Sequence, residues 1–273
     1  MPFAWDELAE HYHDEVITPF SDEVSFPLAA DIERVRRARA VQTVVDFGCG
    51  CGEALEMVAG QVPLAAGIDL SEGMLQETRR RLSRSTRRDA AIDTAAGAAR
   101  RLRKRVDALS DTSSAEAGNV WLGQIDLRRL GALAGRVDLA LAINSICPRT
   151  ARQAQVLFDN IAATVRPGGT LIAVFPSLDT MEHLFALHRR DGLDPSSIGQ
   201  VHGQRGLFVD STDEQQKYFR PAEIEQLFEG SGLQLVKLEK LHYPWPLIDA
   251  SGWGNFPRDE EIWDWYAVGQ CPQ

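Results

Sequence analysis

Three glycines at alternate positions, Gly48, Gly50 and Gly52, follow a short apolar run at residues 41–47. Glycine lacks a Cβ atom, so the backbone of such a loop can turn sharply and approach a bound ligand. No Lys follows in the register that a phosphate-binding P-loop requires, and the third glycine comes two residues after the second, not three. This spacing argues against a P-loop and against the G-x-G-x-x-G loop that binds the pyrophosphate of NAD.

Three aspartates lie at the ends of successive apolar runs, at Asp46, Asp69 and Asp126. A carboxylate at Asp46 would repel a pyrophosphate and attract a cationic ligand. Asp69 has the position from which an acid can accept hydrogen bonds from both hydroxyls of a ribose. Asp126 follows the third run, within reach of an adenine amino group. One strand-end Asp is equally explained as a turn former or a helix cap, but three in succession favour a ligand site.

These residues belong to an alternation of expected strands and helices. Apolar β-branched runs that stop at glycine or proline predict strands, and apolar residues at helical spacing predict the helices between them. The pattern predicts an α/β fold with a doubly wound, mostly parallel sheet. The expected strands are residues 41–47, 64–69, 120–125, 136–144, 170–175, 233–241 and 262–268, and the expected helices are residues 5–17, 28–40, 53–59, 150–165, 219–228 and one that begins after the N-cap Ser71.

Neither an internal repeat nor a linker rich in Gly and Ser divides the 273 residues, so we expect a single domain over residues 1–273. Residues 1–40 are expected to form a helical N-terminal cap and residues 83–118 a basic helical insertion. Residues 177–218 are expected to cover the substrate side, and the stretch 178–210 is expected to be irregular.

Charge is distributed unevenly along the chain, whose net charge is −10. The segment Arg79–Arg105 contains eleven Arg and Lys residues against two Asp residues. It is either an electrostatic handle for an anionic partner or a solvated helical insertion, and we favour the insertion. Because the chain as a whole repels anions, we expect no nucleic-acid partner, although this segment leaves that alternative open.

The four cysteines, Cys49, Cys51, Cys147 and Cys271, give no zinc-ribbon spacing, so no metal site is expected. Cys49 and Cys51 are better explained as small residues in a tight loop in a reducing compartment. No apolar run is long enough to span a membrane, and the first residues lack the basic and apolar regions of a secretory signal. We expect a cytoplasmic protein, and the sequence does not indicate its oligomeric state.

The motifs together resemble class I S-adenosylmethionine-dependent methyltransferases. The resemblance implies a Rossmann-like sheet of seven mostly parallel strands with an antiparallel last strand, and S-adenosyl-L-methionine as the cofactor. It covers residues 41–82 and 119–240 well. The similar segments are residues 44–52 (first motif), 67–75 (the motif after it), 123–127 (adenine side), 138–145 (fourth strand), 165–172 (loop into the fifth strand) and 219–241 (last helix and sixth strand), with 264–269 loosely similar to the seventh strand.

For the methionine part of the cofactor, the resemblance implies contacts with the backbone of Gly48, Gly50 and Gly52. Asp46 helps to hold the ammonium group, directly or through water, and Asn144 touches the amino-acid part. A cofactor with sulfonium and ammonium groups also accounts for an acidic site.

For the adenosine part, the resemblance implies that Asp69 binds the ribose hydroxyls and that Leu70 covers one face of the adenine. Ile125 and Asp126 read the adenine edge.

Two features depart from the family. Residues 83–118 lengthen the usual link between the second and third strands. The N-S-I-C-P sequence from Asn144 is neither the N-P-P-Y signature of adenine amino methylation nor the Pro-Cys order of cytosine methylation.

The catalytic residue is left open by the sequence. Methyl transfer from a sulfonium is an in-line displacement, so a general base is needed only if the acceptor must lose a proton. Candidates are His11, Tyr12 and His183, and each is also explained by a surface or packing role. The wider set of candidates adds His13, His188 and His202, and an aromatic tail that could wall an apolar pocket or simply pack consists of Tyr243, Trp245, Trp253, Phe256, Trp263, Trp265 and Tyr266.

Three functions fit the sequence. The first is methyl transfer to a small organic molecule, which the negative net charge favours. The second is methylation of RNA or protein, docked through the Arg-rich segment, and the third is a member that binds the cofactor without catalysis. A dehydrogenase is a more distant alternative, and NAD binding would identify it.

Overall fold

A central β-sheet forms because the apolar runs along the chain become strands that are buried on both faces. In this computed structural model the sheet order is β10-β11-β6-β5-β1-β2-β4-β3. The strands are β1 (Thr43–Phe47), β2 (Leu64–Asp69), β3 (Ala115–Ala117), β4 (Val120–Gln124), β5 (Val137–Ile143), β6 (Val165–Phe175), β10 (Gln234–Tyr243) and β11 (Ile262–Gln270). The residues that the structure describes are 4–12, 16, 18–20, 24, 26–38, 41–85, 104, 115–117, 120–190, 192, 194, 196, 199–210, 215–243 and 261–273.

The pairing of the strands confirms the predicted Rossmann-like sheet. β1 pairs in parallel with β2 and β5, β2 with β4, and β5 with β6. β11, the last strand of the chain, is antiparallel to both β6 and β10. The one addition is β3, a three-residue strand that lies antiparallel to β4 at the sheet edge. β3 falls within residues 83–118, where a helical insertion was expected, and most of that insertion lies outside the described residues.

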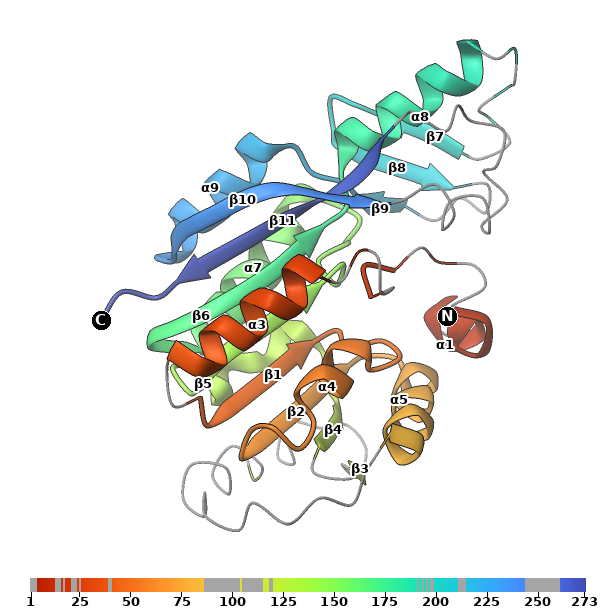
Figure 1. Ribbon diagram of the computed structural model, residues 1–273. Helices are drawn as coiled ribbons and strands as arrows, with labels where there is room; N and C mark the ends of the chain where they lie inside the picture. The colour runs from red at the N-terminus through yellow and green to blue at the C-terminus, as the bar shows by residue number, and fades with distance from the viewer. Residues whose placement is uncertain are drawn as a thin grey trace.

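Helices cover both faces of the sheet (Figure 1). Leu28, Leu55 and Leu75, from α3, α4 and α5, enter one buried cluster, while Phe158 and Ile224, from α7 and α9, enter a second cluster. Each helix therefore buries an apolar stripe against strands that are apolar on both sides. The helices are α1 (Ala4–Leu8), η1 (Ala9–His11), α3 (Phe26–Ala38), α4 (Glu53–Val58), α5 (Glu72–Ser85), η2 (Leu127–Leu133), α7 (Ala151–Thr164), α8 (Leu178–Arg190) and α9 (Pro221–Ser231).

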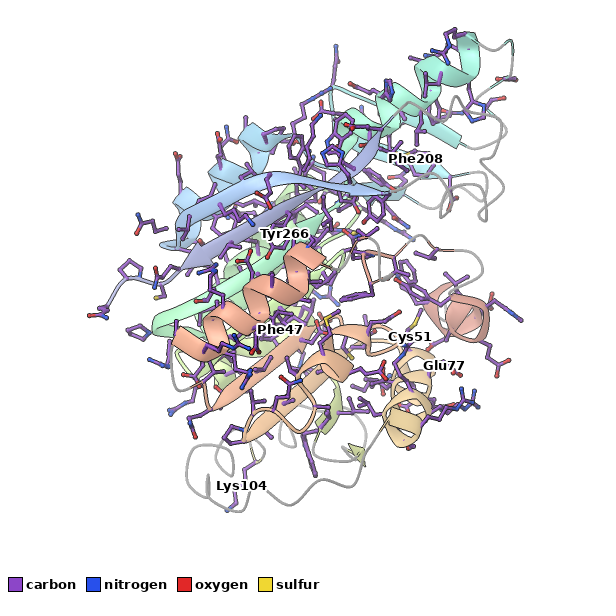
Figure 2. All side chains as sticks on the ribbon, in the orientation of Figure 1. Phe47, Cys51, Glu77, Lys104, Phe208 and Tyr266 are labelled. Atoms are coloured by element: carbon purple, nitrogen blue, oxygen red, sulfur yellow. The ribbon has the colours of Figure 1, made fainter. Side chains whose placement is uncertain are left out.

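The expectation that residues 178–210 are irregular was wrong. They contain α8 and two strands, β7 (Gly199–His202) and β8 (Leu207–Asp210). These two strands form a small antiparallel sheet with β9 (Gln215–Lys217). The apolar side chains of α8 recur at helical spacing, and Phe185 packs edge-on against Phe208 of β8 with ring centroids 6.3 Å apart. Figure 2 labels Phe208 in this part of the protein.

The small sheet is anchored at the carboxyl ends of β5 and β6. The Lys217 N–H donates to the Pro148 carbonyl at 2.7 Å, and the Phe219 N–H donates to the Pro176 carbonyl at 2.8 Å. The Lys217 ammonium is buried and donates to the Glu223 carboxylate at 2.7 Å. These contacts fix the end of β9 beside the edge of the main sheet where the predicted site residues lie.

Within residues 1–40, where a helical cap was expected, the structure describes the helices α1, η1 and α3, with turns at residues 19, 20 and 24. Beyond η1, Tyr12 is also helical and its carbonyl accepts from the Val16 N–H at 2.9 Å, while residues 13–15 and 17 lie outside the described part, so where the expected helix 5–17 ends stays a prediction. Among the described residues, no helix combines the length and the apolar character that a membrane span requires. A single domain over residues 1–273 stays a prediction.

Asp138 joins the two central strands at their amino ends. Its Oδ2 accepts hydrogen bonds from the backbone N–H of Gln42 at 3.0 Å and of Thr43 at 2.8 Å, and from the Thr43 hydroxyl at 2.8 Å. The Arg166 guanidinium donates to Oδ1. The Asp138 carboxylate is buried, so it accepts hydrogen bonds from N–H and O–H groups to which water has little access.

Replacing Asp138 by Ala should therefore lower the free energy of unfolding by about 2–4 kcal/mol, because buried N–H donors lose their acceptor. Urea unfolding measures this difference. The control is Asp159→Ala on α7, whose carboxylate accepts from Gln155 at the surface and whose loss should matter by about 0.5 kcal/mol or less. Equal losses in the two variants would contradict the role given to Asp138.

Candidate functional site

The site lies where the carboxyl ends of β1, β2, β4 and β5 meet. From β1 the chain moves to β2 and β4 on one side of the sheet, and it then returns to β5 on the other side of β1. Such a reversal opens a crevice at the carboxyl ends of the strands, where open α/β sheets bind their ligands. The predicted cofactor-binding residues fall near the carboxyl ends of these strands or on the loops that follow them.

The glycine loop has the geometry that its composition predicts. Gly48, Gly50 and Gly52 have positive φ angles of 74°, 51° and 84°. A Cβ atom on Gly48 would lie 2.4 Å from the Ser145 Cβ, and one on Gly52 would lie 2.6 Å from the Thr78 Cγ2. A Cβ on Gly50 would meet nothing within 4 Å. Gly48 and Gly52 are thus required by packing, whereas Gly50 faces open space beside the loop.

Helix α5 braces this loop through side chains that the sequence analysis did not identify. The buried Thr78 hydroxyl donates to the Gly50 carbonyl at 2.6 Å, and the Arg81 Nε donates to the Cys51 carbonyl at 3.0 Å. Figure 2 labels Cys51 near α1 and α5, and its Sγ is 3.6 Å from the Met74 Sδ. The spacing of Met74, Thr78 and Arg81 on one helical face was the available signal.

Asp69, at the end of β2, accepts two backbone hydrogen bonds. Its Oδ2 accepts from the Gly50 N–H and its Oδ1 from the Ser71 N–H, both at 2.9 Å. Burial raises the pKa of the Asp69 carboxyl, and these two hydrogen bonds oppose the shift. Ser71 caps α5 as predicted, because its Oγ accepts from the Met74 N–H at 3.1 Å. Asp69 therefore links the glycine loop to the start of α5.

Asp46 is the most buried acid of the site, with 3% of its surface exposed. Burial, then the charges of Glu53 and Asp69, raise its pKa well above the ordinary value. Its Oδ1 accepts no hydrogen bond from the described residues. An unpaired carboxylate oxygen beside two further acids is a place where a cation or a strong hydrogen-bond donor would be stabilised.

The three adenine-side residues lie next to Asp69. The Ile125 N–H donates to the Asp69 carbonyl at 2.9 Å, and the Leu70 carbonyl accepts from the Gln124 amide at 3.0 Å. Asp126 caps η2, and its carboxylate accepts from the Arg128 N–H and guanidinium, which lowers its pKa. The cap that was the alternative explanation of Asp126 is therefore present, and its contact with adenine stays a prediction.

Asn144, just after β5, has a φ angle of 48°, which is unusual for a residue with a side chain. Its Nδ2 donates to the Asp264 Oδ2 at 2.8 Å, and the Tyr243 hydroxyl donates to the same oxygen at 2.6 Å. Asp264 and Tyr243 come from β11 and β10, about a hundred residues later in the chain. The sequence analysis placed Tyr243 only in the aromatic tail and did not identify Asp264.

Tyr12 enters the site from the N-terminal cap. Burial raises the pKa of its phenol, and nearby groups that raise it further include Glu53, Cys147 and Asp69. Burial and the Asp264 charge also raise the pKa of the Cys147 thiol to about 12. The phenol and the thiol are therefore protonated at neutral pH. Tyr12 is the candidate acid–base residue that the structure brings to the crevice.

The histidine candidates lie elsewhere or outside the description. His11 is exposed on η1, and His202 is exposed on β7. His183, on α8, has its ring centroid 6.5 Å from that of Trp263, which precedes Asp264 on β11 and so points to the opposite face of the sheet. His188 is partly buried on α8.

The described residues contain no group of three His, Cys, Asp or Glu side chains that could hold a metal ion. His13, Trp245, Trp253 and Phe256 lie outside the described residues.

The comparison with protein families identifies the class to which this fold and site belong. The model of the methyltransferase domain family matches residues 21–238, which is most of the chain. The chain therefore belongs to the methyltransferase domain family. The resemblance drawn from the glycine loop and the strand-end acids is confirmed at this level.

Methyltransferases are among the known proteins that are similar to the chain. Over 65 residues it is 48% identical to trans-aconitate 2-methyltransferase of Methylobacterium nodulans, a match that spans 23% of this chain and 25% of that relative. The structure is similar to 1,6-didemethyltoxoflavin-N1-methyltransferase of Burkholderia thailandensis (TM-score 0.57, 14% identity, 98% of this chain and 85% of that one). It is also similar to the N-methyltransferase NodS of Bradyrhizobium japonicum (TM-score 0.56, 14% identity, 99% of this chain and 100% of that one). At these identities the two structures show a shared fold.

Replacement of Asp46 by Asn should stabilise the protein without ligand. An acid whose pKa is raised by folding binds more protons folded than unfolded, so its ionisation weakens the fold as pH rises. The variant should gain roughly 1 kcal/mol of unfolding free energy at alkaline pH, and the gain should vanish below about pH 4.

Urea unfolding at several pH values measures this gain. The control is Asp194→Asn, at an exposed position where hydrogen bonds from Ser196 lower the pKa, so the effect should have the opposite sign. An Asp46→Asn variant less stable than the wild type at every pH would mean that Asp46 has a stabilising partner.

Proposed function

We propose that the protein transfers a methyl group from S-adenosyl-L-methionine to a small organic acceptor by in-line displacement. The observation that carries this proposal is the buried, unpaired Asp46 oxygen among acids, beside a glycine loop that leaves open space at Gly50. A sulfonium and an ammonium group would relieve that repulsion, whereas a pyrophosphate would increase it. S-Adenosylhomocysteine, the demethylated product, is bound in both solved relatives described above.

The described residues fit this cofactor at both of its ends. Asp46 and Asn144 would bind the ammonium group, and the backbone of the glycine loop would lie along the methionine part. Asp69 would accept hydrogen bonds from the ribose hydroxyls, because a carboxylate is an acceptor at both oxygens. Leu70, Ile125 and Asp126 would surround the adenine.

Catalysis would then depend chiefly on orientation. When bound, the cofactor supplies an electrophilic methyl group on a sulfonium. The chain's own residues must hold the acceptor atom in line with that methyl group and exclude water. Tyr12 and Cys147, protonated at neutral pH, can donate hydrogen bonds to the acceptor and are not bases in their resting state.

A small molecule suits this protein better than a nucleic acid. Several Arg residues at the described start of the basic segment pair with acids of the chain itself, among them Arg79 with Glu72 at 2.8 Å and Arg81 with Glu56 at 3.2 Å. Paired side chains have less charge to offer a phosphate backbone. We place the reaction in the cytoplasm, where the free cysteines of the chain would stay reduced.

Titration calorimetry with S-adenosylmethionine and S-adenosylhomocysteine tests the proposal. Both ligands should bind the wild type, and Asp69→Ala should weaken both by more than about tenfold, because two ribose hydroxyls lose a charged acceptor. A well-folded wild type that binds neither ligand would overturn the proposed function.

Gly50→Ala tests whether the cofactor occupies the open space beside the glycine loop. The added methyl group would enter the space beside the loop, so S-adenosylhomocysteine binding should weaken by about tenfold or more. The matched control is Gly60→Ala, since Gly60 also has a positive φ angle, 73°, and an equally open Cβ position. Both variants should lose similar stability through backbone strain, about 1 kcal/mol, but only Gly50→Ala should lose affinity. Equal affinities in the two variants would contradict this location of the site.

A further inference from the structure

The buried oxygens at the crevice that accept no hydrogen bond from the described residues include Asp46 Oδ1 and Asn144 Oδ1. They come from neighbouring parallel strands, because Asp46 lies in β1 and Asn144 follows β5. A buried acceptor without a donor is unfavourable, and a ligand group with several N–H donors would satisfy it. The α-ammonium group of the proposed cofactor is such a group.

The orientation of the Asn144 amide decides whether it can serve as an acceptor. The backbone is fixed, since the Asn144 N–H donates to the Val174 carbonyl at 3.0 Å. The amide nitrogen faces Asp264, to which it donates at 2.8 Å. The oxygen is on the other arm of the planar amide, so it points away from β11. A rotated amide would instead present N–H donors on that side, where an ammonium group would be repelled.

Asp264 is itself held in one orientation. Its Oδ2 accepts from the Tyr243 hydroxyl at 2.6 Å as well as from Asn144, and its Oδ1 accepts from the Ser177 N–H at 3.1 Å. All three partners donate, so the group acts as a carboxylate that only accepts. Rotating the Asn144 amide would bring two oxygens together at 2.8 Å, which the carboxylate does not allow.

We propose that Asp264, held by Tyr243, is a positioning residue that turns the carbonyl oxygen of Asn144 toward the amino group of the cofactor. The inference rests on the proposed function. Asp264 acts from β11, the last strand of the chain, through Asn144, on a ligand that it does not touch. The side chain of Asn at position 264 could donate as well as accept, so Asp264→Asn allows both orientations of the Asn144 amide.

The test compares two probes: S-adenosylhomocysteine and 5′-S-(3-carboxypropyl)-5′-thioadenosine, which is the same molecule without its amino group. Calorimetry gives the affinity of each for the wild type and for Asp264→Asn. The wild type should prefer S-adenosylhomocysteine, and the variant should lose that preference by about tenfold, as expected for one charge-assisted hydrogen bond. The affinity for the deaminated probe should change by less than about threefold.

Two further variants keep the test decisive if Asp264→Asn does not fold. Tyr243→Phe removes one hydrogen bond to Asp264 and should lower the preference by about threefold. The control is Thr180→Val, because the Thr180 hydroxyl bonds the backbone of Trp263, beside Asp264, without contacting Asp264 itself. It should lower stability and leave the preference unchanged.

An equal loss of affinity for both probes in Asp264→Asn would overturn the inference, because it would show a general structural role. An unchanged preference in both Asp264→Asn and Tyr243→Phe would overturn it as well. Failure of S-adenosylhomocysteine to bind the wild type is a different result, since it removes the proposed cofactor and this inference together.

Discussion

The burial of acids at the carboxyl edge of the sheet is the constraint on which the rest of the site depends. Asp46 lies in the most central parallel strand, and Glu53 and Asp69 add charge that opposes its ionisation. Water would normally stabilise such charges, but the flanking strands and helices exclude it. Backbone N–H donors at Asp69 offset part of the cost of burying these carboxylates, whereas one oxygen of Asp46 accepts no hydrogen bond from the described residues. The fold thus keeps a local instability that a cationic ligand can remove.

Helix α5 connects this edge to the start of the chain. The Asp6 carboxylate accepts from the Ser71 hydroxyl at 2.6 Å and from the Gly73 N–H at 2.9 Å. These contacts place α1 against the first turn of α5, whose dipole favours an acid there. The same helix braces the glycine loop through Thr78, so the N-terminal cap and the loop are held by one element. Tyr12 reaches the acids of the crevice as a consequence of that docking.

The parts of the fold that depend on local pattern could be predicted from the sequence. Strands such as β1 and β5 are mostly apolar runs, and the loop after β1 shows its glycines directly, so the positions of Asp46, Asp69 and Gly50 at the strand ends could be predicted, while their roles stay predictions. Asp264 was not identified, because its importance arises from the register of β11 against β6, and nothing near residue 264 indicates it. The apolar residues of α8 recur at helical spacing, but the histidines between them drew attention to a different role, so this helix was not predicted. The adenine contacts of Asp126 and the catalytic role of Tyr12 stay predictions.

This division has a physical origin. The residues proposed to hold the cofactor belong to consecutive strand–loop–helix units, so each is fixed by its neighbours in sequence. The groups proposed for the acceptor side come from distant segments: Tyr12 from the cap, Cys147 after β5, and Tyr218 after β9. Burial and the nearby Cys147 and Asp264 raise the pKa of the Tyr218 phenol. Such a surface can change its shape and its donors without altering the glycine loop. A motif that identifies the methyl donor therefore carries little information about the acceptor, because the residues proposed to meet the acceptor lie outside that motif.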